Sequence, residues 1–250
     1  MKIRLLFSIT ILVVLIGCMN DALSGDPKPE FSSKEFEFGR IPRGVIVPHI
    51  FYLKNMGGDS LVISKVRSHC GCTSIPVIDS IVYSGDSVAI ELQFRSSGYR
   101  GSTKKSASVN IIADTMETLE RIYFHTYVDT NSTPFTYGEL ATNIGYVKFD
   151  TKTESQEIAL FSRVAAERNI RVVNYQSERI ELSWTETKIA PKDTVILQIT
   201  RLLPPEQLIA SVTLEMEGFQ NTRITLPVLG ENYKQPVKRS VRPAQQRWKK

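Results

Sequence analysis

Short runs of alternating apolar and polar residues fill the chain from residue 35 to residue 128. Apolar residues two positions apart point to one side of an extended chain, so this alternation predicts half-buried β-strands. Polar turns such as Ser84-Gly85-Asp86 separate the runs. About seven short strands in roughly a hundred residues is the pattern of a β-sandwich. The apolar positions are Phe36 and Phe38; Phe51 and Leu53; Leu61 and Ile63; Val88, Ile90, Leu92 and Phe94; Ala107, Val109 and Ile111; and Ile122, Phe124 and Val128.

The same pattern returns after residues 129–134, and two of its stretches resemble the first unit. Residues 193–199 (DTVILQI) are similar to residues 86–92 (DSVAIEL) at an offset of 107, and residues 210–214 (ASVTL) are similar to residues 107–111 (ASVNI) at an offset of 103. Two similar stretches at nearly one offset are typical of an internal duplication. We therefore expect an all-β protein made of two copies of one sandwich module.

The N-terminus has the features of a secretory signal. Lys2 and Arg4 precede residues 5–16, an uncharged apolar run that is too short for a bilayer span and fits a signal peptide. The run ends in Leu-Ile-Gly-Cys, which resembles the lipobox of bacterial lipoproteins, in which the cysteine is lipidated and becomes the first mature residue. We expect lipidation of Cys18, which would anchor the mature protein at a membrane surface. The alternative is an uncleaved anchor with an incidental cysteine.

Residues 21–30 contain Ser, Gly and two prolines but few apolar side chains, which is the composition of a spacer. Some lipoproteins are exported to the cell surface by acidic residues directly after the lipidated cysteine, and here Met19-Asn20-Asp21 follows. We therefore expect the protein to face the periplasm, on the outer membrane.

Basic residues are concentrated at the C-terminus. Of 31 basic residues, two lie in the leader and seven in residues 234–250, which hold no acidic one, so the body has 22 basic and 26 acidic residues. We expect this tail to be disordered until it meets an anionic partner, such as lipid headgroups, cell-wall polymer or an acidic protein face. A merely solubilising tail is the alternative, and nucleic acid is not an expected partner outside the cytoplasm. The candidate contacts are Lys238, Arg239, Arg242, Arg247, Lys249 and Lys250.

Reactive side chains are concentrated in one stretch, His69-Cys70-Gly71-Cys72-Thr73. In an extended chain Cys70 and Cys72 share a face with Cα atoms about 6.6 Å apart, near the upper limit for a disulfide. Gly71 can bend the chain and bring the sulfurs closer, so a local, strained disulfide is one interpretation. The other is a dithiol redox pair or a copper(I) or zinc site, with His69 as a third ligand. On an extended chain His69 faces away from Cys70, which favours a surface histidine.

The duplication bears on this pair. Adding about 105 to its positions leads to Tyr175 and Ser177, and the second unit contains no cysteine. The predicted fold therefore does not require Cys70 and Cys72.

The first module resembles a bacterial family known only as a domain of unknown function, DUF1573. The family pattern runs Phe-x-Phe-Gly-x-Ile, Phe-x-Leu-x-Asn-x-Gly, Cys-Gly-Cys-Thr and Gly-Asp-x-x-x-Ile-x-x-x-Phe. These motifs correspond to residues 36–41, 51–57, 70–73 and 85–94. The resemblance implies an immunoglobulin-like sandwich related to Hydin-type modules, in a family frequent in envelope lipoproteins of Bacteroidetes-like bacteria. The second module lacks the cysteines and the Asn-x-Gly turn.

The expected organisation is two tandem immunoglobulin-like β-sandwich domains after a lipoprotein signal peptide. The expected ranges are a signal peptide over residues 1–17, a spacer over 18–30, a first domain over 31–130, a second over 131–233 and a basic tail over 234–250.

No sequence motif of a phosphate-binding loop, a zinc protease or a serine hydrolase is present. His49 and His125 stand alone in apolar-rich strands, and a hydrogen-bonded or exposed ring is expected for each. Glu35 with Glu37, and Glu215 with Glu217, are expected as solvated charges on outer strand faces. We therefore predict a non-enzymatic, cofactor-free envelope lipoprotein that binds an envelope protein or cell-wall partner; the alternative is a thiol or metal module that uses the cysteine pair.

Overall fold

The computed structural model describes residues 25–69, 72–74, 81–130 and 139–233. In these ranges the regular elements are strands and two single-turn 3-10 helices, so the expected all-β class is confirmed. None of the helices in the described ranges is long and apolar enough to span a bilayer.

The first nine strands form a two-layered sandwich. One layer has the order β1-β3-β7-β5, and the strands of the other follow the order β2-β9-β8-β4-β6. The bounds are β1 (Pro29–Phe31), β2 (Glu35–Pro42), β3 (Ile46–Asn55), β4 (Leu61–Ser68), β5 (Cys72–Ser74), β6 (Ile81–Val82), β7 (Ser87–Arg95), β8 (Gly101–Ala113) and β9 (Met116–Asp129).

The last nine strands repeat this topology strand by strand, each matching the strand nine places earlier. One layer has the order β10-β12-β16-β14, and the other contains β15-β13-β17-β18 with β11 parallel to β18, as β2 is parallel to β9. The two stretches of sequence similarity fall on matching pairs, β7 with β16 and β8 with β17. The bounds are β10 (Leu140–Thr142), β11 (Val147–Phe149), β12 (Ser155–Ser162), β13 (Arg168–Tyr175), β14 (Ile180–Trp184), β15 (Lys188–Ile189), β16 (Thr194–Arg201), β17 (Ile209–Met216) and β18 (Phe219–Gly230).

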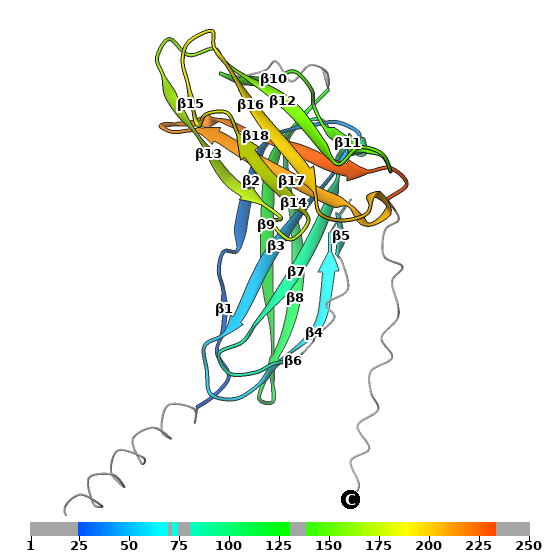
Figure 1. Cartoon of the computed structure of the whole chain (residues 1–250). Coiled ribbons are helices and arrows are strands. Elements are labelled where there is room, and N and C mark those ends of the chain that lie inside the picture. The colour runs from blue at the N-terminus through cyan, green and yellow to red at the C-terminus, as the bar shows by residue number, and fades with distance from the viewer. Residues whose placement is uncertain (1–24, 70–71, 75–80, 131–138, 234–250) are drawn as a thin grey trace, which may run out of the picture.

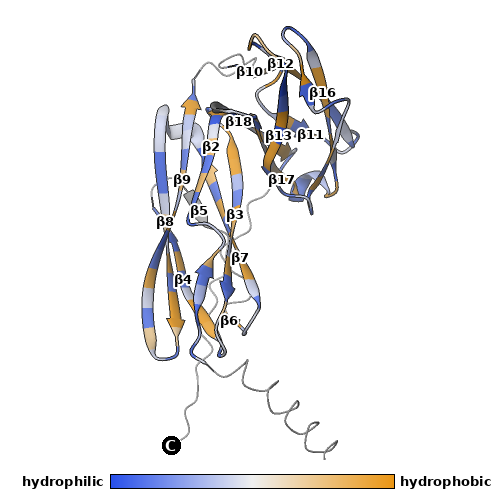
Figure 2. Ribbon diagram, turned by 90° about the vertical axis from the view of Figure 1, so that its left-hand side faces the viewer, coloured by the Kyte–Doolittle hydropathy of each residue, from blue (hydrophilic) through white to orange (hydrophobic). Residues whose placement is uncertain are grey.

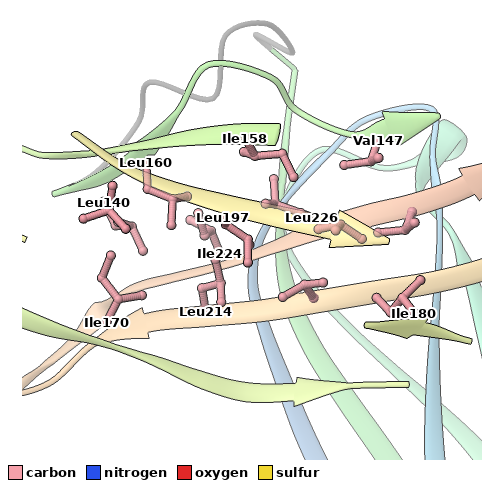
Figure 3. Packing of buried hydrophobic residues seen from close by; sticks show 14 of the residues in the cluster. Leu140, Val147, Ile158, Leu160, Ile170, Ile180, Leu197, Leu214, Ile224 and Leu226 are labelled. Carbon is pink, nitrogen blue, oxygen red and sulfur yellow. The ribbon is translucent and has the colours of Figure 1, made fainter. Parts of the chain in front are cut away.

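Each sandwich has its own buried apolar cluster, one between Phe38 and Val128 and one between Leu140 and Val228. In the second cluster, side chains from both layers, such as Ile158 and Leu214, point into the space between them (Figure 3). Hydrophobic and hydrophilic bands alternate along the strands of the first sandwich (Figure 2), because one face of each layer packs on the core and the other faces solvent.

The described structure begins before the expected first domain. Pro29 and Glu30, expected in the spacer, belong to β1, which pairs with Leu53–Asn55 of β3. The other expected boundaries lie at or beside undescribed residues and stay predictions.

The second sandwich lies across one end of the first (Figure 1). A single residue pair, Ile224 with Arg40, joins β18 to β2 in parallel, so the two larger layers form one ten-stranded sheet. All eight residues of β17 are buried, because one face covers the second core while the other lies against β3 of the first sandwich. We call the contact of β2, β3 and β7 with β17, β18, Arg179 and Tyr233 the joint.

Candidate functional site

The Cys-Gly-Cys stretch leads into β5, an edge strand. Cys72 pairs with Phe94 of β7, whereas Cys70 and Gly71 lie outside the described residues, so the disulfide, redox and metal interpretations stay predictions. The matching strand of the second sandwich is β14, in which Ile180 pairs with Arg201. Because Arg201 follows Phe94 by the same 107 residues that relate the two repeats, Ile180 and not Ser177 takes the place of Cys72.

His69 lies just beyond β4 and is exposed. Its ring Nε2 is 2.8 Å from Ser108 Oγ, and its backbone N–H donates to Ser106 O at 3.0 Å. The prediction of a surface histidine agrees with this placement. Within the described part of the chain, no three His, Cys, Asp or Glu side chains form a group that could hold a metal ion.

His49 does not fit the expectation of a hydrogen-bonded or exposed ring. It is 7% exposed, its ring stacks on Phe36 at a centroid distance of 3.7 Å, and Phe38 and Phe51 meet it edge-on. Its Nδ1 has no hydrogen-bond partner in the described protein. Burial lowers the pKa of His49 to about 3, so at neutral pH the ring is an uncharged member of an aromatic cluster. His125, by contrast, lies 3.7 Å from the Glu35 carboxylate.

The two carboxylate pairs differ. Glu35, Glu37 and Glu217 are exposed, as predicted, but the prediction for Glu215 is wrong: its side chain is 8% exposed. Arg171 and Arg223 both bind this carboxylate, Arg223 at 2.5 Å. Burial alone would raise the pKa of Glu215, but the hydrogen bonds and charges of the two arginines lower it below its usual value. Sequence alternation marks this face of β17 as polar, and the first sandwich covers it.

A second ion pair spans the joint. Arg179 donates two hydrogen bonds to the Glu91 carboxylate, at 3.2 and 2.6 Å, and a third to Ile209 O at 2.9 Å. The Arg179 and Glu91 side chains are 16% and 13% exposed. Burial opposes the charge of Arg179, but the bonds to Glu91 and its charge raise the pKa of the guanidinium. Next to this pair, Gln93 Nε2 donates to the Tyr233 hydroxyl at 2.9 Å.

Gly39 of the Phe-x-Phe-Gly motif brings the two backbones together at the joint. Its φ is +67°, and a Cβ there would lie 2.0 Å from Arg223 O. The carbonyls of the two residues before Gly39 accept bonds from the second sandwich: Thr225 Oγ1 donates to Phe38 O at 2.6 Å and Arg223 Nη1 donates to Glu37 O at 3.2 Å. Ser211 Oγ adds a bond to Pro48 O at 3.1 Å. Gly39 of this motif therefore allows the close contact between the two sandwiches, in addition to its place in β2.

The Asn-x-Gly and Gly-Asp motifs meet at the opposite end of the first sandwich. Asn55 is fully buried, and its amide nitrogen donates to Asp59 O and Val82 O while its Oδ1 accepts from Lys28 N and Gly57 N. Its backbone N–H donates to Asp86 O at 2.9 Å. A Cβ on Gly57 would lie 2.0 Å from Asp26 O. These contacts hold the N-terminal segment against two turns.

Strand β14 ends the smaller layer of the second sandwich, and in the described ranges no strand pairs with its outer side. The backbone N–H of Thr185 donates to Ile196 O at 3.0 Å, and the backbone N–H of Leu202 donates to Arg179 O at 2.8 Å. The backbone groups of odd-numbered residues in this strand therefore point toward β16. Antiparallel strands alternate, so the backbone groups of Leu182 and Trp184 point outward. We call these outward groups, with the half-buried Leu182 and Trp184 side chains that pack on the core, the open edge. The alternating pattern of the second unit predicted strands, but it could not show which neighbours each strand lacks.

The remaining predicted site residues lie outside the described ranges. These are Cys18 and the tail residues Lys238, Arg239, Arg242, Arg247, Lys249 and Lys250. One open surface hollow of about 520 Å³ is lined by Arg40, Arg100 and Asp129, among others, and Arg40 is paired with Asp129 at 3.3 Å.

No protein of curated function matches this sequence. Similar solved structures include a protein of unknown function from Porphyromonas gingivalis W83, with 12% identity over 80% of this chain and 99% of that chain and a TM-score of 0.35. The periplasmic chaperone SfaE has 10% identity over 81% and 100% of the two chains and a TM-score of 0.31. The Vibrio cholerae VesB protease has 10% identity and a TM-score of 0.35, and the match covers 40% of this chain and 31% of the protease.

The model of DUF1573, described as a protein of unknown function, matches residues 29–128. The match ends with β9 and does not include the second sandwich, which lacks the cysteines and the Asn-x-Gly turn. The three motifs placed above, around Gly39, Asn55 and Asp86, all lie inside it. The first sandwich, residues 29–128, therefore belongs to the DUF1573 family.

Proposed function

We propose that this protein is a lipid-tethered, non-enzymatic binding component of the bacterial cell envelope, and that it holds an extended segment of a partner protein at the open edge of β14. The observation that carries the proposal is this edge, where an added strand could bond to the backbone of Leu182 and Trp184. Strand addition uses such backbone groups for affinity and neighbouring apolar side chains for specificity.

The joint supports the same role. Edge strands are usually protected from pairing by charged residues, proline, a bulge or a covering segment. An unpaired edge strand that carries half-buried apolar side chains can accept a strand of a partner protein. Arg179, directly before β14, is bound to Glu91 of the first sandwich. The edge is therefore held in a fixed position on a larger body, which lowers the entropy lost when a partner binds.

The envelope location belongs to this proposal. It is supported by the leader and the Leu-Ile-Gly-Cys stretch of the sequence, with Cys18 as the lipidated residue, the periplasmic face of the outer membrane as the location and the basic tail as a second, anionic contact. A role without catalysis or cofactor is likewise part of the proposal. The redox or metal role of Cys70 and Cys72 stays a prediction.

The test compares how the mature body retains envelope proteins in three forms. Leu182→Pro removes an N–H that points outward and does not bond to β16, whereas Leu182→Ala removes the same leucine side chain but keeps that N–H. We expect the wild type and Leu182→Ala to retain a common partner and Leu182→Pro to lose it, with thermal unfolding confirming that all three are folded. A wild-type body that elutes as a monomer and retains nothing, with or without residues 234–250, would refute the proposal. So would equal retention by the proline and alanine variants.

A further inference from the structure

The end of the first sandwich that lies away from the joint exposes large apolar side chains. Met56, Ile81, Tyr83 and Met116 are 51%, 48%, 63% and 68% exposed. They belong to the turn after β3, to β6 and the turn after it, and to the β8–β9 hairpin, which lie together at the bottom of Figure 1. We call the turns 55–60, 83–86 and 113–116, with Ile81, the tip.

The strand register places the elements that carry these side chains next to one another. Val82 pairs with Leu61, Leu61 with Ala113, and Ala113 with Met116, so β6, β4 and the hairpin form one row. Ser84 Oγ donates to Gly57 O at 2.6 Å, which joins the turn after β6 to the turn after β3. The four exposed apolar residues therefore lie on elements that are joined at this end of the first sandwich.

The described chain starts at this same end. Gly25 and Asp26 lie beside Gly57 and Gly85, and Asn55 binds Lys28. Figures 1 and 2, which differ by a quarter turn, both show the first described residues leaving the molecule at the tip, opposite the second sandwich. The close approach of Asp26 O to Gly57 fixes the point from which the N-terminal segment departs.

The chain length between this point and the proposed anchor is short. Gly25 is seven positions after Cys18, and a fully extended chain covers at most about 3.6 Å per position, so the lipidated cysteine lies within about 25 Å of the tip. Under the lipid tether of the proposed function, on which this inference rests, the tip is then the part of the folded body nearest to the membrane.

The chemistry of the tip fits lipid headgroups that carry no net charge. Tyrosine and aliphatic side chains gain free energy at the boundary between headgroups and hydrocarbon. Asp59, Asp86 and Asp114 are exposed at the same end, and anionic lipids would repel them. We infer that the tip contacts the zwitterionic lipid surface, so that the molecule stands on the membrane and holds the second sandwich and its open edge away from it.

The test places one tryptophan at either end of the lipidated, full-length protein. Trp184→Phe and Trp248→Phe remove the native tryptophans, and Tyr83→Trp at the tip is compared with Tyr146→Trp, an equally conservative change at a 45% exposed tyrosine of the second sandwich. Each protein is bound to phosphatidylcholine vesicles with and without brominated acyl chains, and circular dichroism confirms that it is folded. We expect brominated lipid to quench the tryptophan at position 83 and shift its emission to shorter wavelength, and to leave the tryptophan at position 146 unchanged. Quenching at position 83 should weaken as phosphatidylglycerol is added.

Two other measurements separate this inference from the tether. The mass of acylated Cys18 reports the tether alone, and flotation reports whether the protein is bound to the vesicles at all. Protein that floats without quenching at position 83, or with equal quenching at both positions, overturns the tip contact and leaves the tether standing. Protein that is not acylated and does not float overturns both.

Discussion

Gly39→Ala tests the joint most sharply, because the structure gives the size of the disturbance. The new Cβ would lie 2.0 Å from Arg223 O, and the backbones would have to separate by at least 1 Å to reach the 3.0 Å that is the practical minimum. That movement breaks the bonds from Thr225 to Phe38 O and from Arg223 to Glu37 O, worth about 1 kcal/mol each. The positive φ adds about 1–2 kcal/mol for a non-glycine residue. We expect a total loss in unfolding free energy of about 3–4 kcal/mol.

Gly44→Ala is the matched control. Gly44 also has a positive φ, +89°, but a Cβ there would meet no atom within 4 Å, so only the cost of about 1–2 kcal/mol remains. Urea unfolding of the Trp248→Phe background, followed by Trp184 fluorescence and by circular dichroism, gives both values. A Gly39→Ala protein no less stable than Gly44→Ala would refute the reasoning, since it would mean that the backbones do not meet at this glycine.

Three further predictions concern charge and sulfur. The pKa of His49 is about 6.5 in the unfolded chain and about 3 in the folded protein, so the unfolded chain takes up a proton first as the pH falls and acid favours unfolding. Urea titrations should show that the free energy of unfolding falls by about 3 kcal/mol between pH 6.5 and pH 4, and that His49→Phe lacks this loss. Equal pH profiles of the two proteins would contradict this. Removing one partner of the partly buried pair Arg179–Glu91, by Arg179→Ala or Glu91→Ala, should cost about 2 kcal/mol each, and the double variant should lose less than the sum. Additive costs in the double-mutant cycle would show that the pair is not coupled. Alkylation of the native protein should add mass at Cys70 and Cys72 only after reduction if they form a disulfide, and mass added without reduction would favour the redox or metal alternative.

The strands and the duplication could be predicted from the sequence because they depend on local alternation. Residues such as Val88, Ile90 and Leu92 alternate strictly, and the strand that contains them, β7, is half-buried as expected. The offsets of 107 and 103 fell on strands with matching neighbours in the two sandwiches. Alternation identifies the polar and apolar sides of each strand, and this information is enough to predict the fold class.

The joint could not be predicted in this way, because a polar face says nothing about what covers it. Glu215 alternates with apolar residues like an exposed carboxylate, yet two arginines bind it and its side chain is only 8% exposed. His49 shows the converse, since a histidine among Phe36, Phe38 and Phe51 is polar in sequence and part of the core in space. The open edge depends on which strands are neighbours, which is a property of the sheet and not of residues 180–184 alone.

Site-specific photo-crosslinking in intact membranes tests the central claim of binding at the open edge most directly. Ser183 of β14 and Glu157 of β12 are both exposed, and Gln198 pairs with each of them, so all three lie in one row of the same layer. A photoreactive residue at position 183 stands beside the open edge, whereas one at position 157 lies two strands away. The account predicts a defined adduct with one partner protein from position 183, absent from position 157 and lost with Leu182→Pro. No adduct from either position, or the same adduct from both, would contradict it.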